Sequence, residues 1–142
     1  MKASTRNIIR NALDQQVPAM QTARDSIRRP GKGWLQAVRD AIGMTRSNAG
    51  KTAGVTRQSY TAFERAEADR SITLKSLERA AAAMDCEVVY FLVPRPGEGG
   101  TFAALAQKHD PVFRHLEKAE HSMALEGQAV GDLSSRPKSS PS

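Results

Sequence analysis

The chain has 142 residues, a formal net charge of +6, 39% apolar residues and one cysteine. This length and apolar fraction allow one compact core, and the single cysteine excludes an internal disulfide or a thiolate metal cluster. No apolar run approaches the ~20 residues of a membrane span, and the N-terminus lacks the apolar stretch of a signal peptide. We therefore expect a cytoplasmic protein.

Basic residues are concentrated in the first part of the chain. Residues 1–58 hold 11 Lys and Arg and 3 acidic residues, whereas residues 59–142 hold 10 and 12. A positive field attracts phosphates, so this distribution favours a nucleic-acid partner. A generic solvated basic face is the alternative interpretation.

Two helical regions are expected before residue 45. Apolar residues recur at helical spacing over residues 5–27, which predicts one or two amphipathic helices with a kink or break at Pro18. A further helix is expected from Trp34 to Ile42, where Gly43 ends it. With few aromatic residues available, the core should be aliphatic and alanine-rich, which suits an all-α domain.

Residues 45–64 have the glycine and apolar spacing of a helix-turn-helix. Gly50 supplies a position of almost no size where two helices cross closely, and Gly54 tolerates the positive φ of the turn. Val55, Tyr60 and Phe63 should face inward and fix the second helix. This pattern predicts a DNA-reading element.

The outward face of the second motif helix supplies the expected base contacts. A guanidinium can bond both major-groove acceptors of guanine, and a carboxamide matches the donor and acceptor of adenine. The second helix of such a motif enters the major groove with its N-terminal side chains. The predicted base-contact residues are Arg57, Gln58, Thr61 and Ala62.

Three further residues are expected to contact DNA phosphates. Arg46 stands at the N-terminus of the first motif helix, where its charge and the exposed amides both favour an anion. Lys51 lies on the same helix, and Thr56 is expected to cap the reading helix and to touch phosphate.

Thr73 is expected to cap a fourth helix, which is followed by a run of β-branched and aromatic residues over 86–93. This run predicts a single strand that ends at Pro94. A lone strand has unpaired edges, so a second copy could pair with it across a twofold axis. Pairing with its own chain, or packing as an extended segment, is equally open. The candidate dimer residues are Val88, Val89, Tyr90 and Phe91.

The remaining chain is divided by composition. We expect an N-terminal helical extension over residues 1–30, a helix-turn-helix domain over 31–95 and a helical C-terminal extension over 96–126, interrupted near Pro111. Residues 127–142 are small, polar and proline-rich, which predicts a disordered tail.

No pattern in the chain predicts an enzyme, a cofactor or a metal site. Ala49-Gly50-Lys51-Thr52 imitates the end of a phosphate-binding loop, but position 45 is Thr and no strand precedes it. The three histidines are spaced by six residues, which places successive rings on different helix faces. They are His109, His115 and His121.

Residues 5–125 resemble the family called mobile mystery protein A, a branch of the Xre-type, lambda-repressor-like helix-turn-helix proteins. The resemblance implies five short helices, binding to palindromic double-stranded operators as a homodimer, and a neighbouring Fic-domain protein. Five segments carry it: Gly33-Trp34-Leu35, Ile42-Gly43-Met44-Thr45, Phe63-Glu64-Arg65-Ala66-Glu67, Thr73-Leu74-Lys75-Ser76-Leu77 and residues 85–95.

The expected function is a sequence-specific transcriptional regulator, an autoregulatory repressor of the Xre type. The alternative is an antitoxin-like protein that binds a neighbouring Fic-domain toxin. The expected fold is an all-α, lambda-repressor-like five-helix domain with an N-terminal helical extension and a short C-terminal strand.

The chain departs from the family pattern in the first motif helix. It has Ala49 where leucine is usual and Gly50 where alanine is usual. Because glycine inside a helix costs ~1 kcal/mol relative to alanine, Gly50→Ala is expected to raise the melting temperature without loss of operator binding.

Overall fold

The computed structural model describes residues 2–112, which form two compact units. The central unit is Ala23–Phe91, and the terminal unit is the described part of Met1–Thr22 and Leu92–Ser142. Six α-helices and one short 3-10 helix, η1, are present in this range, so the expected all-α class is confirmed. The second C-terminal helix, the tail over 127–142, His115 and His121 lie outside the described residues.

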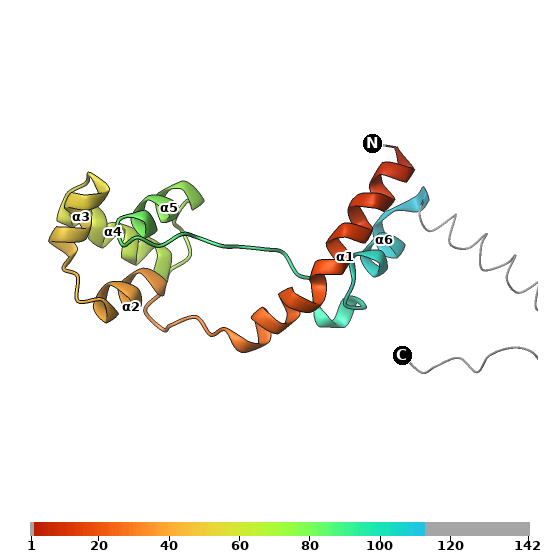
Figure 1. Ribbon diagram of the computed structural model, residues 1–142, viewed down its shortest axis with the longest axis horizontal. Coiled ribbons are helices and arrows are strands. Elements are labelled where there is room, and N and C mark those ends of the chain that lie inside the picture. The colour runs from red at the N-terminus through yellow and green to blue at the C-terminus, as the bar shows by residue number, and fades with distance from the viewer. Residues whose placement is uncertain (1, 113–142) are drawn as a thin grey trace, which may run out of the picture. The chain divides into compact units, whose positions relative to one another are not determined.

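The central unit is built from four helices that Figure 1 shows grouped together. They are α2 (Trp34–Ala41), α3 (Arg46–Ala53), α4 (Arg57–Ala68) and α5 (Leu74–Ala82). Helix α4 contacts the other three, and α3 also contacts α5. The four helices predicted from the residues therefore form, and this unit contains four where the resemblance implied five.

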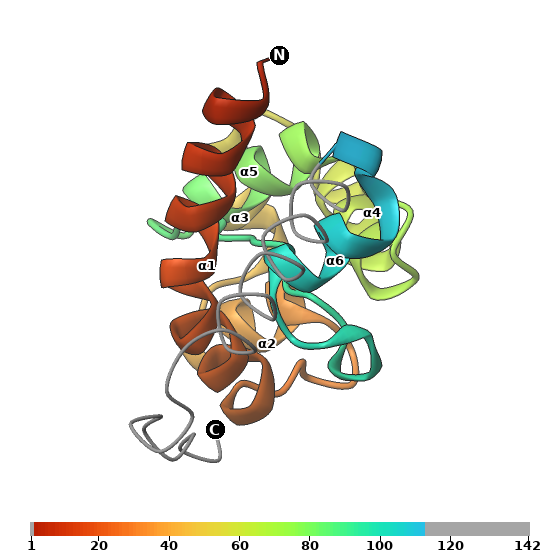
Figure 2. The same ribbon diagram turned by 90° about the vertical axis from the view of Figure 1, so that its right-hand side faces the viewer.

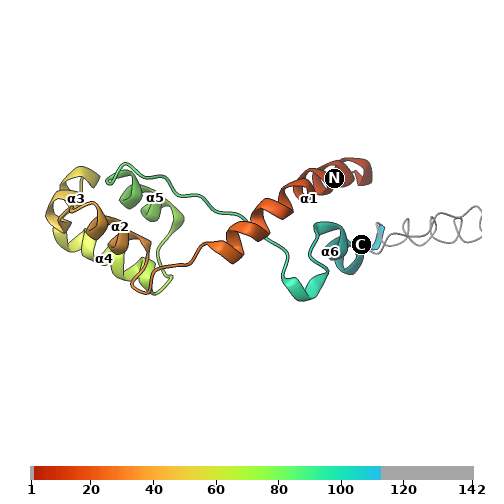
Figure 3. The same ribbon diagram turned by 60° about the horizontal axis from the view of Figure 1, so that its bottom comes forward.

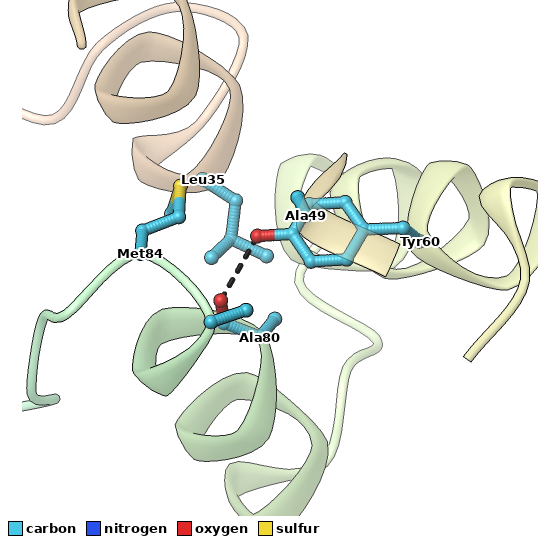
Figure 4. Close-up of a cluster of buried hydrophobic side chains, with 6 residues drawn as sticks. Leu35, Ala49, Tyr60, Ala80 and Met84 are labelled. Carbon is cyan, nitrogen blue, oxygen red and sulfur yellow. Dashed lines mark hydrogen bonds between the residues drawn. The ribbon is translucent and has the colours of Figure 1, made fainter. Parts of the chain in front are cut away.

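A small core lies between these helices. Leu35, Ala49, Tyr60, Ala80 and Met84 are buried in one cluster, which Figure 4 shows at the meeting point of α2, α3, α4 and α5. The cluster is mostly aliphatic and alanine-rich, as the composition predicts. Partly buried residues complete it: Val38, Met44, Ala53, Val55, Phe63, Ile72 and Leu77.

Threonine begins most of these helices. The Thr56 hydroxyl accepts a hydrogen bond from the Ser59 amide at 3.0 Å, and Thr73 accepts one from Ser76 at 3.1 Å. Each bond satisfies an amide that has no partner inside its helix. Thr45 and Thr101 cap α3 and α6 in the same way.

Helices α2 to α5 all end with the same turn, in which a residue with positive φ follows the helix. Gly43 has φ 73°, Gly54 74°, Arg70 68° and Asp85 57°. Each turn has the paired hydrogen bonds of a Schellman motif. The longer bonds run from the amides of Met44, Val55, Ser71 and Cys86 to the carbonyls of Arg39, Gly50, Ala66 and Ala81.

Glycine favours this conformation and other residues pay about 1–2 kcal/mol for it, so Arg70→Gly is expected to stabilise the domain by up to about 1 kcal/mol. The gain is less than the full cost because glycine also loosens the unfolded chain. Asp85→Gly should gain less, since aspartate tolerates positive φ better than arginine. Arg70→Ala is the control, because it removes the charge but keeps the Cβ. Thermal unfolding measures all three, and an equal gain in Arg70→Ala and Arg70→Gly would contradict the backbone explanation.

The terminal unit contains residues from both ends of the described chain. Helix α1 (Ala3–Ser26) lies beside α6 (Phe102–His109), as Figure 3 shows. The Asp14 carboxylate accepts hydrogen bonds from the amides of Phe102 at 2.6 Å and Ala103 at 3.1 Å, so α1 caps the first turn of α6. Asp110 is bound by Arg6 at 2.9 Å. η1 (Pro96–Glu98) precedes α6.

Of the kink or break expected at Pro18, the break does not occur. Helix α1 runs uninterrupted through this residue and appears as one continuous coil in Figure 2. Proline removes one amide donor from the ladder, and its ring crowds the carbonyl of the residue four positions earlier. The Thr22 hydroxyl donates to the Pro18 carbonyl at 3.0 Å within the same helix.

The expected strand over residues 86–93 is not formed in the described part of the chain. The segment has no regular secondary structure, and Val89 and Leu92 expose 76% and 80% of their surface. β-branched residues make a segment suited to a sheet, but a strand also needs a pairing partner. Residues 2–112 supply none, which removes the option of pairing within this range.

Candidate nucleic-acid interface

Helix α4 separates a buried face from an exposed one. Arg57, Gln58 and Ala62 are exposed, and Thr61 is half-buried. On the opposite face Tyr60 is fully buried, and its hydroxyl donates to the Ala80 carbonyl at 2.9 Å (Figure 4). The four predicted base-contact residues therefore share the outer face, at the N-terminal half of the helix.

The inner face of α4 is anchored by its aromatic residues. The rings of Tyr60 and Phe63 meet edge to face with centroids 6.1 Å apart. Val55, in the turn, packs on the same core. Burial raises the pKa of Tyr60 to about 12, so its hydroxyl keeps its proton and its bond to α5.

Gly50 lies at the closest approach between α3 and the turn. A Cβ at this position would come within 2.9 Å of the Thr56 carbonyl oxygen and 3.1 Å of the Val55 carbonyl oxygen. Both are backbone atoms, so no side-chain rotation relieves the contact. This contact reverses the expectation from helix propensity, so Gly50→Ala is now expected to destabilise the domain.

The predicted contact residues meet at one open depression on the central unit. Arg46, from the start of α3, lies beside the outer face of α4 at this place. A second arginine, Arg65, lies two turns after Arg57 on α4 and borders the same depression. The full lining is Arg46, Arg57, Gln58, Thr61, Ala62, Arg65, Ala66, Asp69 and Ser71.

The other two predicted phosphate residues stand apart from this depression. Lys51 is exposed near the end of α3. The Thr56 hydroxyl accepts from the Ser59 amide and donates to the Ser59 hydroxyl at 3.0 Å, so its donor has a partner within α4.

A buried ion network that the sequence interpretation did not identify holds Arg46 in place. Glu64 is only 3% exposed and lies between Arg39 and Arg46. Arg39 Nε and Nη2 both bond its carboxylate, the latter at 3.2 Å, and Arg46 Nε donates to Glu64 Oε1 at 3.0 Å. The bond to Glu64 raises the pKa of Arg39, against the opposing effect of burial.

A second buried carboxylate fixes the start of α2. Glu67 Oε1 accepts from the Leu35 amide at 2.9 Å, and its other oxygen bonds Arg29 at 2.8 Å. Gly33 has φ 91°, and a Cβ there would come within 2.5 Å of the Glu67 carboxylate. Arg29 is one of the basic residues counted above in residues 1–58. In the structure it binds the Glu67 carboxylate that caps α2.

One sequence signal could have found both carboxylates. Glu64 and Glu67 follow Tyr60 by four and seven residues, so they lie on its buried face of α4. Arg39 follows Leu35 by four residues in the same way. Charged residues at core spacing indicate buried ion pairs, although the spacing does not identify their partners.

The described residues contain no group of three or more histidine, cysteine, aspartate or glutamate side chains that could hold a metal ion. Within residues 2–112, no helix has both the length and the apolar character needed to cross a membrane.

Comparison with known families supports the geometry. Residues 35–91 match a family model described as "Helix-turn-helix". Neither a similar curated protein nor a similar solved structure was found. The matched range covers α2 to α5, including the α3–turn–α4 pair and its exposed outer face. The match and the α3–turn–α4 geometry agree on a helix-turn-helix arrangement within residues 35–91, which supports a role in DNA binding.

Proposed function

We propose that the chain is a sequence-specific DNA-binding transcriptional regulator of the Xre type that represses its own expression. The observation that carries the proposal is the exposed outer face of α4, where Arg57, Gln58 and Thr61 border one depression with Arg46. This face combines groups suited to base edges with a cation suited to phosphate. It is joined rigidly to the core through Tyr60 on the opposite side of the helix.

If α4 is the reading helix, neighbouring side chains would contact different parts of the DNA. Arg57 and Gln58 stand in the first turn of α4, where a recognition helix meets base edges. Thr61 and Ala62 lie one turn further and present a hydroxyl and a methyl group. Lys51 would contact the sugar-phosphate backbone, which positions the domain without reading sequence. Thr56 would do so only by exchanging its hydrogen bond to the Ser59 hydroxyl for one to a phosphate.

Arg57→Ala and Gln58→Ala are each expected to weaken binding to a selected duplex by about 1–3 kcal/mol, or roughly 5- to 150-fold. Duplexes are first selected from a random pool with the wild-type chain, and affinity is then measured by fluorescence anisotropy at fixed salt. Each variant should also relax the preference at one base position. An autoregulatory repressor should select sequences found upstream of its own coding region.

Gln15→Ala is the matched control, because Gln15 is an exposed glutamine on α1, outside the proposed interface. It should bind like the wild type. Unchanged affinity and base preference in both α4 variants would refute the reading role of this helix.

We further propose that the chain binds a palindromic operator as a homodimer through residues 86–93. Val88 is half-buried, whereas Val89, Tyr90 and Phe91 are exposed, and together they form an apolar segment that forms no strand within residues 2–112. A second copy would supply the pairing partner across a twofold axis.

Val89→Lys is expected to convert a dimer into a monomer, because lysine would place charges on both sides of the twofold contact. Val89 is exposed, so the monomer fold should tolerate the change. Sedimentation velocity measures the mass, and near-ultraviolet circular dichroism checks the fold. A wild-type chain that sediments as a monomer, or a variant that stays dimeric, would exclude this contact.

The resemblance also implies a partner, a Fic-domain protein held by an antitoxin-like chain, and this stays a prediction. Residues 96–126 are the expected binding segment. Co-purification with a neighbouring Fic-domain protein, abolished when this segment is removed, would support it. Purification of the two proteins apart would count against it.

A further inference from the structure

A second depression adjoins the reading face and includes residues from outside the helix-turn-helix pair. Lys32, in the loop before α2, and Gln36, in the first turn of α2, line it together with Arg65 of α4. Arg46, Thr61 and Arg65 border both depressions, so the two are neighbours on the surface. The full lining is Gly31, Lys32, Gln36, Arg46, Thr61, Glu64, Arg65 and Ala68.

The charge of this depression is positive. Lys32 and Arg65 are exposed, and Arg46 is partly exposed. The facing carboxylate is Glu64, which is buried and bound by both Arg39 and Arg46. Its charge is balanced inside the protein, which leaves the cations of Lys32 and Arg65 directed to solvent.

A phosphate bound in this depression would be held by side chains rather than by the amides at the N-terminus of a helix. The first turn of α2 lies beside the depression, but its Leu35 amide already donates to Glu67. That carboxylate occupies the positive end of α2 and is itself bonded to Arg29. A phosphate in the depression would therefore depend on Lys32, Arg46, Arg65 and the amide of Gln36.

The spacing along α4 fits a duplex. Arg65 follows Arg57 by eight residues, which corresponds to about 12 Å along a helix axis. The N-terminal residues of a recognition helix contact the base edges, so a side chain this far along α4 lies beyond them. When Arg57 meets a base edge, Arg65 can reach a strand that borders the groove.

We propose that Lys32, Gln36, Arg46 and Arg65 bind a backbone phosphate of the operator, outside the base pairs read by the first turns of α4. This inference rests on the proposed function and adds to it a contact site that extends the footprint toward the loop before α2. The contact would help to fix the direction in which the domain lies on the duplex, because the loop and the second half of α4 line the same depression.

The test compares the salt dependence of binding in Lys32→Ala, Arg65→Ala and the double variant. The slope of log K against log salt should become shallower by about 0.9 for each phosphate that the variant no longer neutralises. Affinity should fall by the same factor for every duplex sequence, unlike the base-specific effect of Gln58→Ala. Lys75→Ala is the control, since Lys75 is an exposed lysine on α5 that borders neither depression.

A second measurement assigns the contact to DNA. Duplexes carrying a single neutral methylphosphonate at successive positions should include one that weakens the wild type and leaves the double variant unaffected. An unchanged salt slope in the double variant, with wild-type DNA binding intact, would overturn this inference alone. A wild-type chain that binds no duplex would overturn the proposed function as well.

Discussion

Glu64→Ala is expected to lower the free energy of unfolding of the central unit by about 3–5 kcal/mol, because it leaves Arg39 buried without its main partner. Arg39 would keep the Met44 carbonyl, at 3.0 Å, and its 3.3 Å contact with Asp40. These do not replace a buried carboxylate that accepts two hydrogen bonds from the guanidinium. Urea unfolding followed by circular dichroism measures the decrease.

The expected cost comes from breaking the pair, so removing both charges should restore much of the stability. Arg39→Met with Glu64→Leu replaces the pair by apolar side chains, which is often neutral or stabilising in a buried site. Arg46→Ala should cost less than Glu64→Ala, since the Arg46 side chain is 33% exposed. A Glu64→Ala variant within about 0.5 kcal/mol of the wild type would show that the network contributes no stability.

Local chemistry made much of the central unit predictable. Thr56 and Thr73 were expected to cap α4 and α5, and each accepts the expected amide three residues later. Gly54 was expected at positive φ and has φ 74°. These features depend on a few neighbouring residues, so the local sequence is enough to predict them.

Contacts between distant residues were not predictable in the same way. Glu64 and Arg39 are 25 residues apart, and Asp14 and the start of α6 are 88 apart. Their spacing indicates which face is buried but not what lies opposite. The bond between Arg46 and Glu64 was missed for the same reason, because the two residues come from different helices.

The segment over 86–93 shows another limit of the same kind. Its composition describes which backbone conformation suits the side chains, whereas a strand exists only when a second strand pairs with it. That second strand belongs to another copy in our proposal, and one chain cannot reveal it.

Gly50→Ala is expected to lower the melting temperature and to weaken DNA binding, in contrast to the effect of helix propensity. Alanine would gain about 1 kcal/mol over glycine inside α3. An overpacked contact costs typically about 1–3 kcal/mol, and here the opposing atoms are the backbone of Val55 and Thr56. The backbone contact should win, because neither atom can move without shifting the turn.

The same shift explains the expected effect on DNA. Thr56 caps α4 and Arg57 begins it, so displacement of the Thr56 carbonyl moves the N-terminal turn that carries the reading residues. Gly97→Ala is the matched control, since a Cβ there meets nothing within 4 Å, its φ is not positive and it borders neither depression. It should leave stability unchanged or slightly higher. Thermal unfolding and anisotropy on the selected duplex measure both variants. If Gly50→Ala instead unfolds at a higher temperature and binds DNA fully, α3 and the turn are less tightly packed than the 2.9 Å approach requires.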